Sequence, residues 1–393
     1  MRAIELFAGA GGLGIGVGLA GFSHLQVLEW NRWCCDTIRE NKSRGVAAVR
    51  GWPEPTEEDV RRVDFRSLGG KLELVSGGPP CQPFSLGGKH RAHDDDRDMW
   101  SEAVRAVRET QPKAFIFENV KGLTRGAFAS YLAYIVHQLT YPETVRLDDE
   151  SWQDHLARLE RRHTGRGRWS GLRYRVIYRV LNAADYGVPQ RRERVVFVGF
   201  RSDLGMEWSF PEATHSLDAL LWDQANGDYW ERHRVARARR ALSARLSERA
   251  ATLRIKPRLR PWRTVRDAIG DLPDPQIEPR KAMSYLNHRF QAGARAYPGH
   301  TGSPLDEPAK TLKAGVHGVP GGENMLSDAE GHVRYFTVRE SARLQTFPDD
   351  FVFHGAWSEA MRQLGNAVPV NLAVVLALEV RAKLATNGEA VDR

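Results

Sequence analysis

The stretch Glu5-Leu6-Phe7-Ala8-Gly9-Ala10-Gly11-Gly12-Leu13-Gly14 decides the fold of this chain. It reads as an apolar strand that runs directly into a glycine turn and then into a helix. Glycines at the carboxyl end of a first strand allow the backbone to approach a ligand, as in open α/β sheets. The turn alone is equally compatible with a plain tight turn, so the neighbouring segments must decide between the two.

An acid ends the next apolar strand. Glu29 stands at the sequence distance at which dinucleotide-binding folds place a carboxylate on ribose hydroxyls, and Trp30 is suited to stack on adenine. The alternative is that Glu29 only begins a helix at Asn31. Asp64, after a further apolar position, is suited to accept a hydrogen bond from an adenine amine. The glycine spacing differs from the phosphate-binding Gly-x-Gly-x-x-Gly, which favours a nucleoside without a pyrophosphate.

The first 200 residues alternate short apolar runs with helical patterns, which predicts an α/β fold with a mostly parallel sheet and right-handed crossovers. The predicted strands are Arg2 to Phe7, Leu25 to Glu29, Leu72 to Ser76, Ala114 to Glu118, Tyr174 to Leu181 and Arg194 to Phe200. The predicted helices are Asn31 to Asn41, Trp100 to Thr110 and Ala127 to Leu139.

The pattern changes at Phe200, where a region rich in Arg, Pro and Gly begins. After Phe353 a helical pattern returns, and the helix predicted at Asn371 to Leu384 has an apolar spacing suited to packing on the first domain. We therefore expect three parts: residues 1–200 as the first domain, 201–353 as a smaller irregular domain, and 354–393 as a segment that returns to the first domain.

Charge and cysteine content limit the function classes. The formal net charge is +8, and Arg232 to Arg266 is crowded with arginine, which suggests a polyanionic partner; the alternative is a solvated helix surface. The three cysteines, Cys34, Cys35 and Cys81, make a poor disulfide framework and favour a reducing compartment. No secretion signal or apolar stretch of about 20 residues is present, so we expect a cytoplasmic protein with no membrane association.

A reactive cysteine is predicted in Gly77-Gly78-Pro79-Pro80-Cys81-Gln82-Pro83-Phe84-Ser85, which follows a strand. A lone cysteine is usually a buried structural residue, but flanking prolines and glycines argue against a place in the core. The chain continues through Gly87 to Arg91, a polar stretch suited to close over a substrate and to bring positive charge to phosphates. Ser85, Lys89 and Arg91 are therefore candidate contacts to a nucleic acid.

Five ordered segments together resemble the cytosine-C5 DNA methyltransferases of prokaryotic type. They are Phe7 to Gly12, Pro79 to Gln82, Glu118 to Val120, Gln190 to Arg194, and Gly365 to Pro369. Order and spacing both match, and the resemblance covers nearly the whole chain apart from the middle of the second domain. It implies a Rossmann-like S-adenosylmethionine methyltransferase domain, a smaller target recognition domain, and methylation of a cytosine flipped out of duplex DNA.

The resemblance also implies roles for single residues. Cys81 adds to cytosine C6. Glu118 shares a proton with ring N3. Arg194 holds O2, and Arg192 braces the catalytic loop. S-adenosylmethionine is the expected cofactor, S-adenosylhomocysteine the product, and no metal is expected. The expected cofactor site contains Phe7, Gly9, Gly11, Gly12, Leu13, Glu29, Trp30, Asp64, Phe65, Pro80, Asn366 and Ala367.

Double-stranded DNA is the partner that the resemblance implies. Thr311 and Leu312 resemble a short Thr-Leu element of the recognition domain and are candidate DNA contacts, and Gly315 to Gly322 is a candidate groove-entering loop. Arg339 to Pro348 resembles a structural scaffold segment. Ser151 to Ser170 is polar and basic and looks like an extra loop without an assigned role. The aromatic residues Trp222, Trp230 and Trp262 are either DNA contacts or core residues, and the core interpretation holds for most of them.

Three other functions compete with this one. A tRNA cytosine methyltransferase would use the same thiolate chemistry, but the basic insert after Phe200 favours duplex DNA. A non-catalytic DNA-binding protein is disfavoured because Cys81, Glu118 and Arg194 are all present. A dinucleotide oxidoreductase would not need Pro-Pro-Cys-Gln. We expect a monomer, with a restriction endonuclease of the same target site as a candidate partner.

Overall fold

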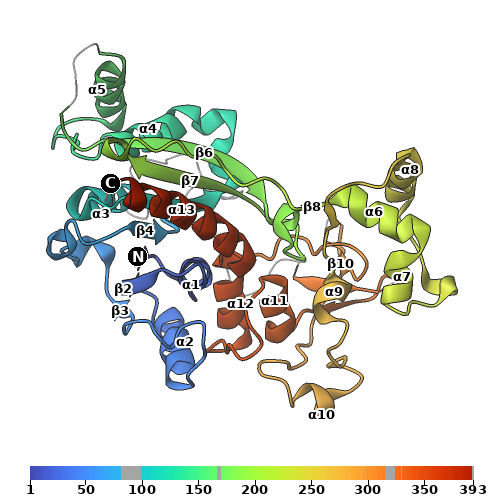
Figure 1. The fold of residues 1–393 in the computed structure, drawn as a ribbon. Helices are drawn as coiled ribbons and strands as arrows, with labels where there is room; N and C mark the ends of the chain where they lie inside the picture. The colour runs from blue at the N-terminus through green and yellow to red at the C-terminus, as the bar shows by residue number, and fades with distance from the viewer. Residues whose placement is uncertain (81–98, 166–169, 299, 315–323, 329, 392–393) are drawn as a thin grey trace.

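The computed structural model describes residues 1–80, 99–165, 170–298, 300–314, 324–328 and 330–391, and the side chains up to 386. Its centre is a seven-stranded sheet with the order β3-β2-β1-β4-β5-β7-β6 (Figure 1). The strands are β1 (Arg2–Leu6), β2 (Ser23–Glu29), β3 (Thr56–Glu57), β4 (Leu74–Gly77), β5 (Ala114–Val120), β6 (Tyr174–Asn182) and β7 (Glu193–Arg201). The α/β fold and the six predicted strands are confirmed.

One strand runs against the others. β7 pairs antiparallel with both β5 and β6, whereas the pairs among β1 to β5 are parallel. The mostly parallel sheet is therefore confirmed, but parallel pairing through crossovers is wrong for β7. The segment 183–192 between β6 and β7 is too short for a parallel return, which needs a dozen or more residues.

The predicted helices are present as α2 (Arg32–Ser43), α3 (Trp100–Thr110) and α4 (Ala129–Thr140). The expectation of a loop at Ser151 to Ser170 is wrong, because α5 (Trp152–Thr164) occupies most of that segment. Ser151 caps this helix by accepting a hydrogen bond from the Asp154 backbone N–H at 3.1 Å. Only a narrow stripe of α5, with Leu156 and Leu159, is buried, which is why its polar composition concealed the helix.

Residues beyond β7 form shorter elements. They are β8 (His215–Ser216), α6 (Leu217–Asn226), α7 (Asp228–Arg232), α8 (Ala244–Thr252), β9 (Arg260–Pro261), α9 (Val265–Ile269), α10 (Pro279–Ala282), β10 (Ser303–Pro304), β11 (Met325–Ser327), β12 (Val333–Tyr335) and α11 (Val338–Leu344). In Figure 1, α6, α7, α8, α9 and β10 lie on the right, away from α5, whereas α10 lies at the bottom and α11 lies beside α12 (Trp357–Asn366) near the centre. This part is less regular than the first, since its strands span only two or three residues.

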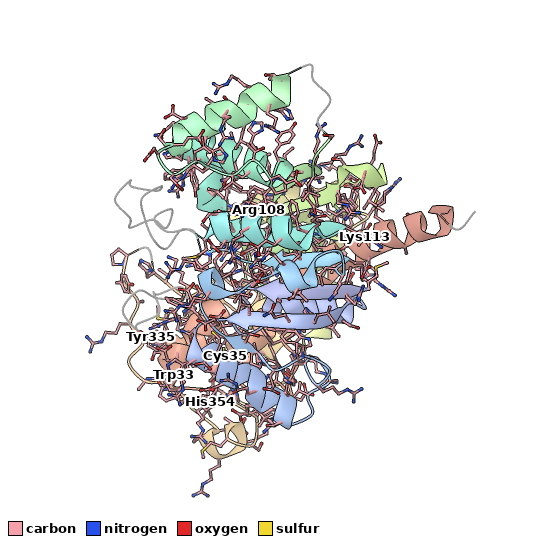
Figure 2. All side chains as sticks on the ribbon, turned by 90° about the vertical axis from the view of Figure 1, so that its left-hand side faces the viewer. Trp33, Cys35, Arg108, Lys113, Tyr335 and His354 are labelled. Carbon is pink, nitrogen blue, oxygen red and sulfur yellow. The ribbon has the colours of Figure 1, made fainter. Side chains whose placement is uncertain are left out.

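The C-terminal segment packs against the first helix of the chain. α12 (Trp357–Asn366) precedes α13 (Val370–Val391), which lies along α1 (Gly12–Leu19). The contact is close: a Cβ atom placed on Gly16 would lie 2.3 Å from the Ala373 Cβ atom. Across α2, the ring of Trp33 stacks on His354 with 5.7 Å between centroids (Figure 2). The two ends of the chain therefore share one core.

A buried acid in the central strand gives a testable pH dependence. Glu5 accepts a hydrogen bond from the Ser76 hydroxyl, and burial raises its pKa from 4.5 to about 8. The folded state therefore holds a proton that the unfolded chain releases, and this stability is lost as the pH rises from about 4.5 to about 8. We expect the unfolding free energy, measured in urea, to fall by about 5 kcal/mol more across this window in the wild type than in Glu5→Gln. Equal pH slopes in the two proteins would contradict the assignment.

Within the described ranges, none of the helices combines the length and apolar character that a membrane crossing requires.

Candidate active site

The glycine turn after β1 is held in left-handed backbone conformations. Phe7, Gly9 and Gly11 have φ angles of 54°, 54° and 92°. A Cβ atom on Gly11 would lie 3.0 Å from the Trp52 ring, and one on Gly12 would lie 2.3 Å from the Val368 carbonyl oxygen, so these two glycines serve packing. Gly9 has open space beside it. The turn is therefore tightly packed at Gly11 and Gly12 and open at Gly9.

Glu29 ties the end of β2 to this turn. Its carboxylate accepts hydrogen bonds from the Gly9 backbone N–H at 2.7 Å and from the Asn31 backbone N–H at 2.8 Å. Asn31, rather than Glu29, caps α2 through the Cys34 N–H at 3.3 Å. Burial raises the Glu29 pKa, and the backbone donors oppose that rise. Trp30 follows with 72% of its surface exposed, so the acid and a free aromatic face stand together at the edge of the sheet.

The other predicted cofactor residues differ in accessibility. Asp64 is exposed and paired with Arg66 at 2.8 Å, and this guanidinium lowers the pKa of Asp64 to about 2. Phe65 is buried, with the Arg105 guanidinium 5.1 Å from its ring centroid. Pro80 and Asn366 are exposed, whereas Leu13 and Ala367 are buried. Phe65, Leu13 and Ala367 are therefore placed in the packed interior rather than at an exposed surface.

A buried ion pair joins two adjacent strands. The Arg194 Nε atom of β7 lies 2.7 Å from the Glu118 Oε1 atom of β5, and both side chains are about nine-tenths buried. Burial raises the Glu118 pKa, while Arg194 and then Arg192 oppose that rise. In a low-dielectric site such a carboxyl keeps or releases a proton according to small changes in its surroundings. The pair thus places a carboxyl group with a raised pKa next to a guanidinium group.

The segment that carries Cys81 begins beside this pair. Asn119, next to Glu118, donates its side-chain amide to the Pro79 carbonyl oxygen at 2.9 Å. The Pro80 carbonyl oxygen accepts a hydrogen bond from the Met99 N–H at 3.2 Å, so the two ends of the segment 81–98 are joined. Cys81 lies outside the described residues, as do the predicted DNA contacts Ser85, Lys89 and Arg91 and the stretch Gly315 to Gly322.

Arg192 connects three distant segments. Its side chain is fully buried and donates to the Leu312 carbonyl oxygen at 3.0 Å and to the Gly365 carbonyl oxygen at 2.7 Å. The Thr311 hydroxyl donates to the Arg191 carbonyl oxygen at 2.7 Å. The side chains of Thr311 and Leu312 therefore face the protein, and Leu312 belongs to a small apolar core. This geometry favours an anchoring contribution over direct DNA contact by these two side chains.

Two glutamines that the sequence did not single out complete this network. The Gln190 side chain accepts from the Leu312 N–H at 3.0 Å and donates to the Leu344 carbonyl oxygen at 3.3 Å. Gln345 donates to the Leu364 carbonyl oxygen at 2.5 Å. Both are fully buried. Their sequence signal is their place inside the quoted segments Gln190 to Arg194 and Arg339 to Pro348.

The scaffold interpretation of Arg339 to Pro348 agrees with the structure. Arg339 is buried and donates to the carbonyl oxygens of Leu286, Pro348 and Phe351. Thr337 and Glu340 form a reciprocal cap at the start of α11. Trp230 is buried in a small core that Trp262 borders, which supports the core interpretation for these two aromatic residues.

The sheet order, the glycine turn after β1 and the acid ending β2 define the class, a Rossmann-like α/β protein with a candidate nucleoside-binding edge. The family model of C-5 cytosine-specific DNA methylase matches residues 1–141 and 169–382, and the chain belongs to this family of enzymes. It is 32% identical over 381 residues to Type II methyltransferase M.PspPI of Psychrobacter sp., covering 95% of this chain and 77% of that protein. It is 31% identical over 385 residues to Type II methyltransferase M.Eco47II of Escherichia coli, covering 96% and 78%.

Solved structures share the fold at low identity. The S. pombe Dnmt2 methyltransferase matches with a TM-score of 0.55 at 15% identity, over 97% of this chain and 99% of that one. The Entamoeba histolytica methyltransferase EhMeth matches with a TM-score of 0.53 at 13% identity, over 98% of both chains. These likenesses support the Rossmann-like architecture.

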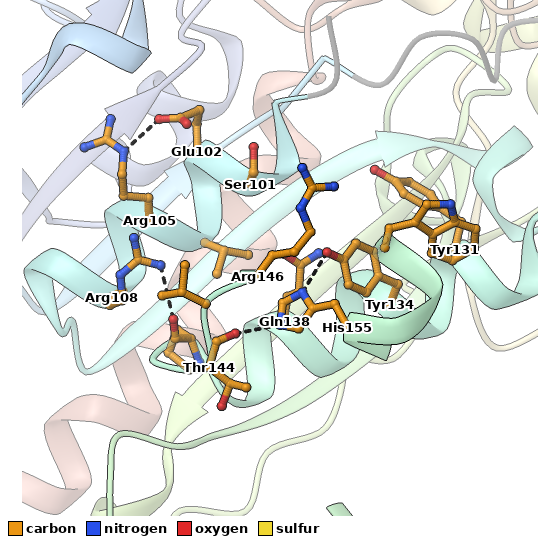
Figure 3. A pocket seen from close by; sticks show the side chains of 14 residues that line it. Ser101, Glu102, Arg105, Arg108, Tyr131, Tyr134, Gln138, Thr144, Arg146 and His155 are labelled. Carbon is orange, nitrogen blue, oxygen red and sulfur yellow. Dashed lines mark hydrogen bonds and ion pairs between the residues drawn. The ribbon is translucent and has the colours of Figure 1, made fainter. Parts of the chain in front are cut away.

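A cavity of about 300 Å³ lies elsewhere, between α3, α4 and α5 (Figure 3). Its lining includes Arg108, Tyr134, Thr144 and His155, and none of the predicted site residues. His155 is satisfied, with Nδ1 2.8 Å from the Tyr134 hydroxyl and Nε2 2.8 Å from the Thr144 carbonyl oxygen. The α5 side of the cavity belongs to residues 142–168, which the family model leaves unmatched. One wall of the cavity thus comes from a segment outside the family match, and the other from α3 and α4 inside it.

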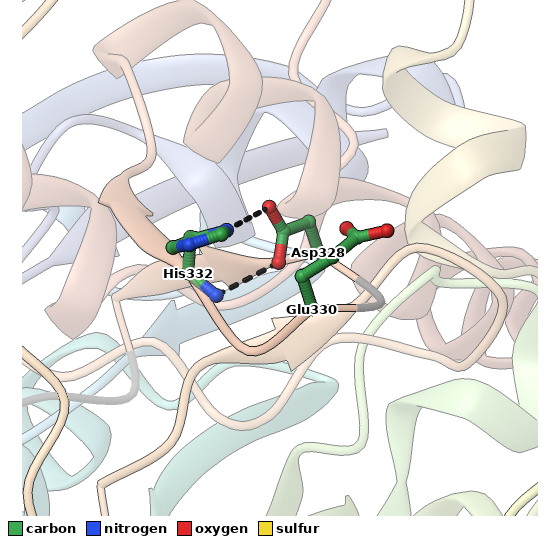
Figure 4. Close-up of side chains that lie close together, drawn as sticks. All are labelled: Asp328, Glu330 and His332. Atoms are coloured by element: carbon green, nitrogen blue, oxygen red, sulfur yellow. Dashed lines mark hydrogen bonds and ion pairs between the residues drawn. The ribbon is translucent and has the colours of Figure 1, made fainter.

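One cluster among the described residues has the composition of a metal site. Asp328, Glu330 and His332 stand together on the turn between β11 and β12 (Figure 4). All three are exposed, and the Asp328 carboxylate already accepts from the His332 backbone N–H at 2.7 Å and lies 3.0 Å from its ring Nδ1 atom. We therefore interpret the cluster as part of the turn.

Proposed function

We propose that this chain methylates C5 of a cytosine flipped out of duplex DNA, within a specific target sequence, with S-adenosylmethionine as methyl donor and Cys81 as nucleophile. The buried Glu118–Arg194 pair carries the proposal, because it lies beside the backbone that leads into Cys81. A flipped base needs donors to its ring on one side and a thiol on the other. The family membership supplies the reaction class, and the pair supplies the chemistry for the ring.

The methyl donor fits the edge of the sheet at β1 and β2. The donor supplies an electrophilic methyl group on a sulfonium. Gly9 leaves open space, Glu29 offers a carboxylate for ribose hydroxyls, and exposed Trp30 offers a face for adenine. Asp64, Pro80 and Asn366 are the other exposed candidates for contact with the cofactor. The remaining candidates are mostly buried, and we propose that they support the cofactor site through packing. We assign no metal to the reaction.

The chain's own residues perform the ring chemistry. The Cys81 thiolate adds to C6, which makes C5 nucleophilic toward the sulfonium methyl group. Glu118 gives or shares a proton at N3, and the Arg194 guanidinium holds O2 while Arg192 fixes the surrounding backbone. After transfer, the C5 proton leaves to ordered water, the Cys81–C6 bond breaks, and the products are 5-methylcytosine and S-adenosylhomocysteine.

The recognition part is proposed to be residues 201–353, with residues 1–200 and 354–393 as the catalytic part. Both curated relatives above are named Type II methyltransferases. On that ground we propose that a restriction endonuclease with the same target site is the partner of this enzyme. We also propose that the enzyme is monomeric and cytoplasmic. Ser85, Lys89 and Arg91 remain our proposed phosphate contacts near the flipped base.

Incubation of the pure protein with S-adenosylmethionine and random-sequence duplex DNA, followed by bisulfite sequencing, tests the proposal. We expect protected cytosines in one short sequence context and none without the methyl donor. Protection on tRNA but not on DNA would overturn the DNA assignment in favour of RNA. No protection on either polymer would leave a binding protein with an inactive fold.

Glu29 offers a test of the cofactor site. Because a hydrogen bond to a charged group contributes about 1.5–3 kcal/mol, Glu29→Gln should raise the KM for S-adenosylmethionine about tenfold or more with little change in kcat. Glu57→Gln is the matched control, since Glu57 ends neighbouring β3 and pairs with Arg39 at 2.7 Å. A KM that is unchanged in Glu29→Gln, or raised equally in both variants, would remove Glu29 from the site.

A further inference from the structure

The positive charge of this chain is concentrated in one place. Residues 232–263, the basic segment, hold twelve of the 57 Lys and Arg residues but only one of the 49 Asp and Glu residues, Glu248. The rest of the chain therefore has 45 basic and 48 acidic residues and is net negative. The chain outside the basic segment therefore gives no net electrostatic attraction to a polyanion. The attraction must come from this segment.

The basic segment is the outer part of a small helical unit with its own core. Leu220, Tyr229, Trp230 and Val235 form that core, which joins α6 to α7, and α8 packs against α6 at the right of Figure 1. The unit leaves and rejoins the chain at one stem, where β8 pairs with β9. It is thus a folded projection rather than a random chain, and its arginines have defined positions.

Most basic side chains of this segment point to solvent without a counter-charge. Arg232 and Arg249 are paired with acids of α6, Asp223 and Asp218. Eight other exposed residues have no ion pair with any described residue: Arg234, Arg237, Arg239, Arg245, Arg254, Lys256, Arg258 and Arg260. A surface of this kind is costly in isolation, because like charges repel, and it is compensated when phosphates replace the diffuse counterions.

The unit is fixed relative to the proposed active site. Asp306 accepts hydrogen bonds from the Tyr229 hydroxyl at 2.8 Å and from Arg266 Nε at 2.6 Å, and its backbone oxygen accepts from Gln224 at 2.8 Å. Trp262 at the stem donates to Asp185 at 3.0 Å. Asp306 lies a few residues before Thr311 in the chain, and Thr311 belongs to the network around Arg192. DNA held by the projection would therefore keep a set orientation toward the site.

We infer that the basic segment is a second, sequence-independent DNA contact surface that binds backbone phosphates outside the base pairs read at the target. The inference rests on the proposed function. Guanidinium groups on an exposed projection match phosphates and carry no base readout. The surface would raise affinity for long DNA and orient the enzyme on it, while the recognition of the target sequence stays elsewhere.

The test variant is the triple substitution Arg237→Gln, Arg239→Gln and Arg245→Gln. Affinity is measured over a series of salt concentrations for a duplex of about 12 base pairs around the target and for one of about 40. Each lost phosphate contact should reduce the slope of log affinity against log salt by about 0.9. We expect a slope reduced by about 3 and at least tenfold weaker binding of the long duplex near 0.1 M salt, with the short duplex little affected.

The control removes the same charge elsewhere, by Arg44→Gln, Arg50→Gln and Arg161→Gln, all exposed and outside the unit. Equal losses in test and control variants, or an unchanged slope in the test variant, would overturn the inference. An equal loss on the short duplex would also overturn it, since the segment would then act at the target. Equal, segment-dependent binding of double-stranded RNA would overturn the assignment to DNA.

The two proposals can fail separately. If the wild type methylates DNA but the test variant binds long DNA normally, only the inference fails. If the wild type methylates nothing, yet its long-duplex binding depends on these arginines, the surface stands and the proposed function falls. Unfolding curves of both variants check that the projection is intact.

Discussion

Replacement of Cys81 by serine should reduce methyl transfer to DNA by more than about a thousandfold while leaving DNA binding in place. A serine hydroxyl stays protonated at neutral pH, whereas a thiol with a pKa of about 8.5 needs only modest activation to give the thiolate. Without addition at C6, C5 of cytosine is too poor a nucleophile for the sulfonium methyl group. The measurement is single-turnover incorporation of labelled methyl groups, with binding measured on the same duplex.

The chain contains its own controls for this experiment. Cys34 and Cys35 are buried in α2, and burial raises the pKa of both thiols, so neither is a ready nucleophile. Cys34→Ala and Cys35→Ala should retain activity, with at most a moderate loss of stability. Full turnover by Cys81→Ser, or a loss of transfer in Cys34→Ala as deep as in Cys81→Ser, would contradict the assignment of the nucleophile.

The strands of the sheet could be predicted because each is a short apolar run bounded by turns or helical patterns, and Glu29 and Glu118 stand near the ends of such runs. That local pattern indicates where strands begin and end. It does not indicate strand direction, and the reversal of β7 followed from the length of the connection after β6. Helix α5 was missed because its buried stripe is too narrow to show as an apolar period.

The network around Arg192 could not be predicted from the sequence. Its partners are the backbone carbonyl groups of Leu312 and Gly365. Because every residue has a backbone carbonyl group, the identity of a residue does not reveal such a partner. The same reason explains Gln190 and Gln345, whose amides bond to main-chain atoms far away in the chain. The sequence indicates which segments matter, whereas only the folded structure shows that they lie next to one another. Leu312, a candidate DNA contact by resemblance, has its side chain in a core for this reason.

The second large effect is expected for Glu118→Gln, with a fall in kcat of about a hundredfold to ten-thousandfold. Glutamine keeps the size of the side chain but has no acidic proton to share with N3. It also leaves the Arg194 guanidinium, 2.7 Å away in the wild type, buried without its counter-charge. Loss of one partner of such a pair costs roughly 3–5 kcal/mol, so the unfolding free energy should fall as well.

Glu193→Gln is the matched control, because Glu193 is an exposed acid of the same region paired with Lys121 at 2.8 Å. This variant should change kcat and stability little, since surface pairs contribute about 0–1 kcal/mol. If Glu118→Gln and Glu193→Gln behave alike, Glu118 has no part in the chemistry.

The pH profile of kcat separates the chemical contribution of Glu118 from its structural one. Burial raises the Glu118 pKa, so the wild type should lose activity with rising pH as this carboxyl gives up the proton meant for N3. Glu118→Gln should lack that decline, whatever its stability, because an amide does not titrate. A double substitution with Arg194→Met should recover part of the lost stability, by removing the unpaired charge, but no activity. Recovery of activity together with stability would show that the pair only holds β5 against β7.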